Sequence, residues 1–302
     1  MGVAGLIEYL TNKHPHLIKS IDLFATPRPL HGHRAFVDAQ IYIVRYALRS
    51  GKIPDIAHQF GFMHRTLLGA TRLQPVFVMD NEARSPLKDL YTTAAREDTR
   101  NRLNRNENYR ELMKDRGRIH AQLHEEFLLR GMRLITAPPG FEAEQACASL
   151  AAKAGGFVVS EDSDSLVFGA PLFLKGFPNK LQIVNLEQVL ETLGISRTQL
   201  IDVSLMSGCD FASKIPGVGI AKAIEAVKKF GCIENFIEHR KFTDKNFHLY
   251  SFFVESFDFQ RGRDVFQAAL DDATVRSLLA RKDKLVSSDI ALLFFVTSLG
   301  RP

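Results

Sequence analysis

Three short apolar runs, each followed by an acidic residue, constrain the fold of this chain more than any other feature. The runs are residues 35–37 before Asp38, residues 76–79 before Asp80 and residues 157–159 shortly before Asp162. Continuous apolar, β-branched runs of this length predict strands buried on both faces, as in a parallel sheet. Because ligands bind beyond the carboxyl ends of parallel strands, we expect these three carboxylates to share one edge of the sheet.

Stretches with helical periodicity separate the strands. They fall at Val44–Leu48, Ile56–Leu73, Leu112–Leu129 and Ala143–Lys153. Strands that alternate with helices indicate an α/β fold with a mostly parallel central sheet. A further helix is predicted at Leu200–Met206, and the Gly-Val-Gly of residues 217–219 before an Ala-rich amphipathic segment predicts a helix-turn-helix. Residues from about 263 onward are expected to be helical, without a predicted place in the fold.

Composition excludes several classes of protein. The chain has 302 residues, of which 45% are hydrophobic and 24% charged, values typical of a soluble protein. Its longest apolar stretches, such as Ile290–Val296, are far shorter than the ~20 residues of a membrane span, and no leader pattern predicts secretion. Cys147, Cys209 and Cys232 lie far apart without a CxxC pair, which favours a reducing compartment and buried thiols.

Positive charge is concentrated in one segment. The net charge is +5, and residues 84–133 alone hold twelve Lys or Arg against eight Asp or Glu. Residues 84–130 carry no strand signal and are rich in Arg, Asn and Glu, which predicts a helical insertion rising from the edge that carries Asp80. Such a basic surface suits a phosphate backbone, although a solvated helix surface would have the same composition.

Seven acids form the candidate site. They are Asp38, Asp80, Glu142, Glu144, Asp162, Asp164 and Asp210. Converging carboxylates repel one another unless cations compensate them, and ligand sets made of oxygen alone suit Mg²⁺, Mn²⁺ or Ca²⁺. The absence of His and Cys from the set argues against zinc. Two such ions can activate a water and stabilise the oxygens of a phosphodiester. The alternative is that the acids are separate helix caps and surface charges.

Two pairs of these acids share an i, i+2 spacing. Residues 138–140, Pro-Pro-Gly, place the first pair on a loop that enters a helix starting near Ala143. Ser163 lies within the second pair, just past a strand, and indicates a turn. Both pairs are therefore expected to converge on one pocket.

These motifs, in this order, resemble the superfamily of structure-specific 5′ nucleases that includes flap endonucleases, exonuclease 1 and the XPG nucleases. The matching segments are residues 1–6, 37–39, 76–80, 137–138, 142–144, 160–169, 207–211 and 215–219. The resemblance covers about residues 1–260. It implies a PIN-like, Rossmann-like nuclease core at 1–212, formed by 1–100 and 130–212 with a helical arch at about 84–130. A helix–two-turn–helix region and C-terminal helices would occupy 213–302.

The resemblance also implies roles for the acids. Asp80 and Glu144 would be inner ligands of one Mg²⁺, with Asp38 and Glu142 close by or acting through water. Asp162 and Asp164 would hold a second ion, supported by Asp210. Mn²⁺ is expected to substitute for Mg²⁺.

The same resemblance implies catalytic and DNA-contacting roles for several basic and glycine residues. Lys88 and Arg96 fall near the catalytic arch residues of the family, where they would stabilise charge on the scissile phosphate, as Asp162 would through metal. The residues expected to contact DNA are Gly2, Arg49, Arg65, Gly217, Gly219, Lys222, Lys228 and Lys229. The resemblance also implies a K⁺ ion at the Gly-Val-Gly turn. Tyr42 is expected to pack in the core, because the base-stacking aromatic of the family falls at Val44.

The implied function is metal-dependent hydrolysis of DNA near single-strand/double-strand junctions, by 5′-flap cleavage, 5′→3′ exonuclease action or both, in replication, repair or recombination. Substrates would be DNA with flaps, nicks, 5′ ends or junctions, in the nucleus. A clamp-binding motif is not seen in the chain. The alternatives are a Holliday-junction resolvase of the same superfamily, a catalytically silent DNA-binding scaffold and a PIN-type ribonuclease.

Overall fold

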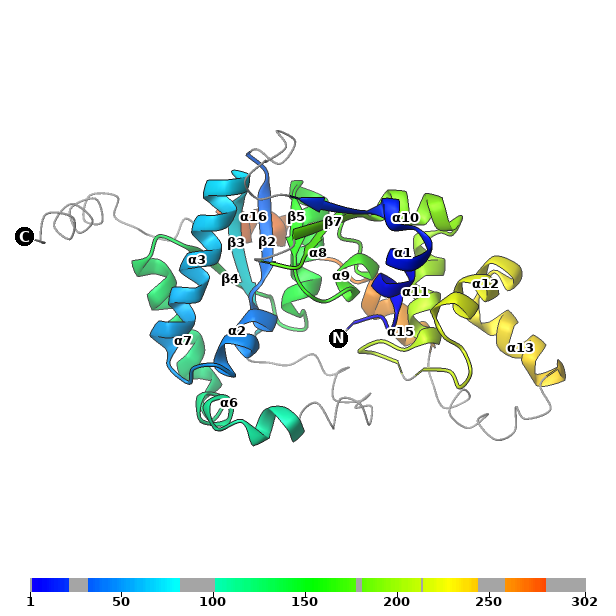
Figure 1. Ribbon diagram of the computed structural model, residues 1–302, viewed down its shortest axis with the longest axis horizontal. Coiled ribbons are helices and arrows are strands. Elements are labelled where there is room, and N and C mark those ends of the chain that lie inside the picture. Colours follow the sequence, from blue (N-terminus) through cyan, green and yellow to red (C-terminus); the bar gives the residue numbers. More distant parts are fainter. Residues whose placement is uncertain are drawn as a thin grey trace, which may run out of the picture.

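A seven-stranded sheet forms the centre of the protein (Figure 1). The computed structural model describes residues 2–21, 32–81, 101–177, 181–212, 214–243 and 259–280. The strands are β1 (Ile18–Ile21), β2 (Arg34–Asp38), β3 (Gln74–Met79), β4 (Arg133–Thr136), β5 (Phe157–Val159), β6 (Leu172–Lys175) and β7 (Leu181–Asn185). Their order is β1-β7-β6-β5-β2-β3-β4, and the pairs between β6 and β4 are all parallel. The predicted α/β fold with a mostly parallel sheet is confirmed.

The three strands predicted from their apolar runs are β2, β3 and β5, which are neighbours in the sheet. The other four strands were not predicted. β1, β4 and β7 mix polar with apolar residues, and the apolar run of β6 at residues 172–174 leads to Lys175 rather than to an acid. β7 pairs antiparallel with both β1 and β6, so this side of the sheet is antiparallel.

Helices cover both faces of the sheet. Those of the first half are α1 (Leu6–Lys13), the 3₁₀ turn η1 (Pro15–Leu17), α2 (Ala39–Ala47), α3 (Ile53–Thr71), α6 (Glu107–Leu112) and α7 (Arg116–Leu129). Those of the second half are α8 (Ala143–Ala154), α9 (Asp164–Val167), α10 (Leu186–Leu193), α11 (Arg197–Ser207), α12 (Ile220–Phe230), α13 (Ile233–Thr243), α15 (Phe259–Gln267) and α16 (Asp272–Ala280).

The alternation of side chains along β2 divides the core into two clusters. Phe36 packs into a cluster with residues of α1, α8, α11 and α12, whereas Val37 packs on the opposite face with residues of α2, α3 and α7. In Figure 1, α3 and α7 lie at one end of the molecule, and α12 and α13 lie at the other. No helix within the described ranges combines the length and the apolar character that a membrane crossing requires.

The predicted helix at Leu112–Leu129 is wrong at its beginning. Leu112 is the last residue of α6, and a new helix begins at Arg116 because the side chain of Asp115 accepts a hydrogen bond from the backbone N–H of Arg118 at 2.9 Å. In α7, Leu123 and Phe127 are buried in the core that it shares with α3 and β3. The C-terminal part of the predicted arch segment, α7, therefore belongs to the layer that covers the sheet.

The predicted helices around the Gly-Val-Gly turn are present. α11 begins with a capping box, in which Ser196 and Gln199 each bond the other's backbone N–H. Residues 208–219 then lead to α12, which packs against α11, and Gly217 has a φ of +73°. The predicted helical character after residue 263 is confirmed for α15 and α16, and residues 281–302 lie outside the described part.

Candidate active site

Strand register brings the first acids to one edge of the sheet. Asp38 is the last residue of β2 and lies opposite Val78 of β3, two residues before Asp80. In the same direction Val37 lies opposite Val159 of β5, which leads to Asp162. The predicted common edge is therefore present, because parallel strands end together.

The beginning of α8 adds two more acids to this edge. Glu142 is the N-cap residue, Glu144 lies in the first turn, and both side chains are buried. The backbone N–H of Ala143 donates to Asp80 Oδ1 at 2.8 Å, which ties the start of α8 to the end of β3. The positive end of the helix dipole favours carboxylates at this position.

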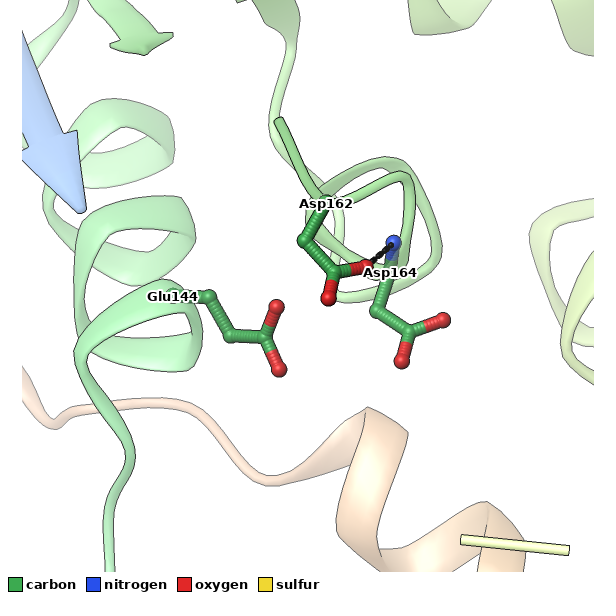
Figure 2. A group of neighbouring side chains, drawn as sticks. All are labelled: Glu144, Asp162 and Asp164. Atoms are coloured by element: carbon green, nitrogen blue, oxygen red, sulfur yellow. Dashed lines mark hydrogen bonds between the residues drawn. The ribbon is translucent and has the colours of Figure 1, made fainter. Parts of the chain in front are cut away.

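Three carboxylates meet at the centre of the site. Oxygens of Glu144, Asp162 and Asp164 all lie within 4.8 Å of one another, and all three side chains are buried, with Asp164 completely inaccessible. Figure 2 shows Glu144 extending from α8 toward the two aspartates of the β5–α9 turn. Three buried anions at this separation need a compensating cation, and their oxygen ligands are those that hard divalent metals prefer. The residues present therefore fit a divalent-metal site.

Local hydrogen bonds hold the turn between β5 and α9 in place. Ser160 Oγ donates to Asp38 Oδ2 at 2.9 Å and accepts from the backbone N–H of Asp162 at 3.1 Å. The backbone N–H of Asp164 donates to Asp162 Oδ1 at 3.1 Å, as Figure 2 shows. Ser160 was not among the predicted site residues. Its position at the end of β5, two residues before Asp162, was the signal that could have identified it.

Two buried cysteines are affected by the charges of the acids. Burial raises the pKa of the Cys147 thiol well above its usual range, and the charges of Asp38, Glu144 and Asp80 raise it further. Burial likewise raises the pKa of Cys209, followed by the charge of Asp164. The carboxylates of Asp38, Asp80 and Glu144 therefore all disfavour the thiolate form of Cys147. Burial of Cys147 and Cys209 is confirmed, whereas Cys232 is only partly buried.

Asp210 lies in a partly exposed turn that follows α11 and is not one of the three acids whose oxygens lie within 4.8 Å of one another. This turn is closed by the bridge between Cys209 and Ala212. The ring of Phe211 packs against Phe168 at the end of α9, with centroids 5.8 Å apart. Because α9 begins with Asp164, this aromatic contact fixes the Asp210 turn relative to the cluster.

Gly2 packs directly against the site. Its φ is +95°, and a Cβ at this position would collide with Asp162 Oδ1 and lie 2.6 Å from Ser163 Oγ. Nearby, the backbone N–H of Ala4 donates to the carbonyl of Gly208 at 3.0 Å. Any residue larger than glycine would therefore displace Asp162 or the N-terminal segment.

The predicted DNA-contacting residues are spread over two regions. Gly217 and Gly219 form the turn before α12; Lys222 Nζ donates to the Gly217 carbonyl at 3.2 Å. Lys228 and Lys229 are exposed in the last turn of α12.

Arg49 and Arg65 are exposed beyond α2 and on α3, on the other side of the acids. Lys88 and Arg96, the predicted catalytic cations, lie outside the described residues. None of these roles is tested by the geometry, and each stays a prediction.

A second group of residues beside the site was missed. Glu161, between Ser160 and Asp162, accepts hydrogen bonds from Tyr42 and from the backbone of Gly176, and it pairs with Arg45. Tyr42 is fully buried, which confirms its predicted packing in the core. The sequence signal for Glu161 was its position directly before Asp162.

Comparisons with known proteins agree with this site. A family model described as the XPG I-region matches residues 131–210. Flap endonuclease 1 of Trypanosoma brucei gambiense is 30% identical over 271 residues, which cover 79% of this chain and 67% of that protein. Flap endonuclease 1 of Brugia malayi is 43% identical over 118 residues, which cover 36% of this chain and 30% of the relative.

Solved structures show the same fold. The catalytic core of Rad2 in complex with DNA substrate has a TM-score of 0.63 at 22% identity, covering 97% of this chain and 95% of that one. Human GEN1 in complex with Holliday junction DNA has a TM-score of 0.60 at 18% identity, covering 90% of this chain and 67% of that one.

The buried carboxylates at the carboxyl edge of the mostly parallel sheet fit a divalent-metal site, and the flap endonuclease relatives show that the chain is a nuclease that hydrolyses phosphodiesters. Within that class, the chain belongs to the superfamily of structure-specific 5′ nucleases, and flap endonuclease 1 is among its relatives. The resemblance drawn from the sequence motifs is thereby confirmed.

Proposed function

We propose that this nuclease cuts DNA near single-strand/double-strand junctions, as a 5′-flap endonuclease, a 5′→3′ exonuclease or both. The observation that carries the proposal is the buried cluster of Glu144, Asp162 and Asp164 at the carboxyl edge of the sheet. DNA as the substrate is supported by the Rad2 core, which was solved with a DNA substrate. Replication, repair or recombination in the nucleus is the setting such a substrate implies.

Mg²⁺ is the proposed metal, with Mn²⁺ as a substitute. Asp162 and Asp164 would hold one ion with support from Asp210, while Asp80 and Glu144 would hold another with Asp38 and Glu142 nearby. A relative, GEN1, was solved with product DNA and Mg²⁺, which supports this choice. When bound, such ions supply Lewis acidity and an activated water. Because Asp80 accepts from the Ala143 N–H, its carboxylate is oriented before any metal binds.

The chain would bind DNA on both sides of these acids. The Gly217–Gly219 turn would hold a duplex phosphate, with K⁺ as an assisting ion, and Lys222, Lys228 and Lys229 would contact the same backbone. The exposure of these three lysines along α12 supports the assignment. A structural neighbour, GEN-1, was solved with potassium, which supports K⁺ as the ion. On the other side, Gly2, Arg49 and Arg65 would contact the strand that is cut, and Lys88 and Arg96 would act on its scissile phosphate.

Junction resolution is a second candidate. Human GEN1, solved with Holliday junction DNA, has a TM-score of 0.60, against 0.63 for the Rad2 core. The Pro-Gly-Val-Gly sequence of residues 216–219 points the same way. Both candidates use the same acids, and the shape of the accepted DNA distinguishes them.

The test is cleavage of labelled 5′-flap, nicked, blunt and four-way-junction DNA in Mg²⁺ or in EDTA. We expect Mg²⁺-dependent cuts beside the junction, and product lengths that separate flap cutting from stepwise digestion. Asp162→Ala should abolish cutting while junction binding stays nearly intact. Glu187→Gln, an exposed acid on α10, is the matched control and should cut normally. Failure to cut any substrate in Mg²⁺ would refute the proposal.

A further inference from the structure

Arg45 lies beside the acid cluster, although no sequence motif pointed to it. It lies on α2, the helix that begins directly after Asp38. Its guanidinium carbon lies 5.1 Å from the centre of the Tyr42 ring, and its Nη1 lies 3.8 Å from Glu161 Oε1. Glu161 is the chain neighbour of Asp162. These contacts hold the guanidinium next to the segment that carries Asp162.

The platform under Arg45 is fixed independently of it. Glu161 Oε1 accepts hydrogen bonds from the Tyr42 hydroxyl at 3.3 Å and from the backbone N–H of Gly176 at 3.1 Å. Tyr42 is fully buried, and burial, followed by the charge of Glu161, raises the pKa of its hydroxyl well above the usual value. Tyr42 therefore remains a neutral donor, and the Glu161 carboxylate keeps its place whether or not Arg45 is paired with it.

The pair of Arg45 and Glu161 is a weak one. Its 3.8 Å separation exceeds a hydrogen bond, and the Arg45 side chain is 37% exposed. Partly exposed ion pairs of this geometry contribute little to stability. A phosphate oxygen pair, by contrast, accepts two parallel hydrogen bonds from a guanidinium. An incoming phosphate can therefore replace Glu161 as the partner of Arg45 at small cost.

We propose that Arg45 is a substrate-binding residue that leaves Glu161 to bind a backbone phosphate next to the scissile one. The inference rests on the proposed cleavage of DNA. Glu161 orients Arg45 in the absence of substrate and competes with the phosphate for it. The ligand is a phosphodiester anion of the strand that enters the acid cluster, so the contact is insensitive to base sequence.

The first experiment measures binding of fluorescent 5′-flap DNA in EDTA at several salt concentrations. Arg45→Ala should weaken binding about tenfold. It should also reduce the slope of log K against log salt concentration by about one, because one fewer phosphate is neutralised. Arg45→Lys should recover part of the loss, because it keeps the charge without the planar fork. Arg276→Ala, an exposed arginine on α16, is the matched control and should change neither quantity.

Glu161→Gln separates substrate binding from a structural role. Glutamine keeps the acceptor oxygen for Tyr42 and Gly176 but removes the competing charge, so DNA binding should become tighter. If the pair serves only to stabilise α2, Glu161→Gln and Arg45→Ala would both lower the melting temperature and leave the salt dependence unchanged. That result would overturn the proposal.

The second experiment locates the phosphate. Flap substrates that carry one neutral methylphosphonate at successive linkages around the cut are tested in single-turnover cleavage with Mg²⁺. Wild-type protein should lose rate at one neighbouring linkage, and Arg45→Ala should be insensitive to neutralisation of that same linkage. Equal, additive losses at every linkage would exclude the contact. If wild-type protein cuts no unmodified substrate, the proposed function itself fails, which is a separate outcome.

Discussion

Replacing Asp164 by asparagine should stabilise the metal-free protein and remove its response to divalent metal. Asparagine has the same shape, so the change removes one charge from the cluster with Glu144 and Asp162. At 4.8 Å, the upper limit of the separations in this cluster, two unit charges in an effective dielectric of about 20 repel by about 3.5 kcal/mol. Side-chain rearrangement and screening reduce this figure, and we expect a gain of about 1–2 kcal/mol in the free energy of unfolding in EDTA.

The assay is thermal unfolding in EDTA and in Mg²⁺. The variant should melt about 2–6 °C higher than wild type in EDTA. Wild type should gain about 2.7 kcal/mol when Mg²⁺ reaches a hundredfold excess over its dissociation constant, and the variant should gain far less.

The same substitution at Asp202 is the control. Asp202 is equally buried, but Arg263 donates to both of its oxygens, so Asp202→Asn should lower the melting temperature in both conditions. An Asp164→Asn variant that melts lower in EDTA, or that responds to Mg²⁺ like wild type, would refute the electrostatic account of the site.

Three further outcomes are expected. Gly2→Ala should raise the Mg²⁺ concentration needed for half-maximal cleavage, because its Cβ would displace Asp162. Phe266→Ala should lower the free energy of unfolding in urea by about 3–5 kcal/mol, because this buried ring of α15 packs on two other phenylalanines. Hydrogen bonds from Arg263 lower the pKa of Glu234 from 4.5 to about 2. A carboxylate whose pKa is lowered in the folded state contributes its full stabilisation above the pKa of the unfolded state, and the contribution is lost as the pH falls to the folded pKa. The stability of the wild type relative to Glu234→Gln should therefore fall as pH drops from about 4.5 to 2.

A different experimental result would contradict each of these three predictions. Gly140→Ala, which also has a positive φ but open space around its Cβ, should cleave normally, and equal loss in both variants would mean that backbone strain alone is at work. A Phe266→Ala variant as stable as wild type would show that α15 does not support the core. Identical pH profiles for wild type and Glu234→Gln in acid denaturation would exclude the ion pair as a source of stability.

The acid-terminated strands and the entry to α8 could be predicted from sequence because they depend on local patterns. An apolar run long enough to be buried on both faces specifies a central strand, and its direction places the next residue at the carboxyl edge. Asp38, Asp80 and Asp162 were assigned to one edge on that basis, and Glu142 and Glu144 to the start of a helix. The short strands β1, β4 and β7 mix polar with apolar residues, and the apolar run of β6 at residues 172–174 is not followed by an acid, so none of the four shows the pattern that identified β2, β3 and β5.

Tertiary structure decided which acids meet and what holds them. Glu144, Asp162 and Asp164 form the buried cluster, and the i, i+2 spacing of residues 142 and 144 did not show which of the two would join it. The contact of Arg45 with Glu161 joins residues 116 positions apart, and the fit of Gly2 against Asp162 joins residues 160 apart. Sequence by itself determined the class of fold and the chemistry of the ligands, because periodicity and residue type are local. Proximity between distant segments exists only once the sheet and its helices have packed.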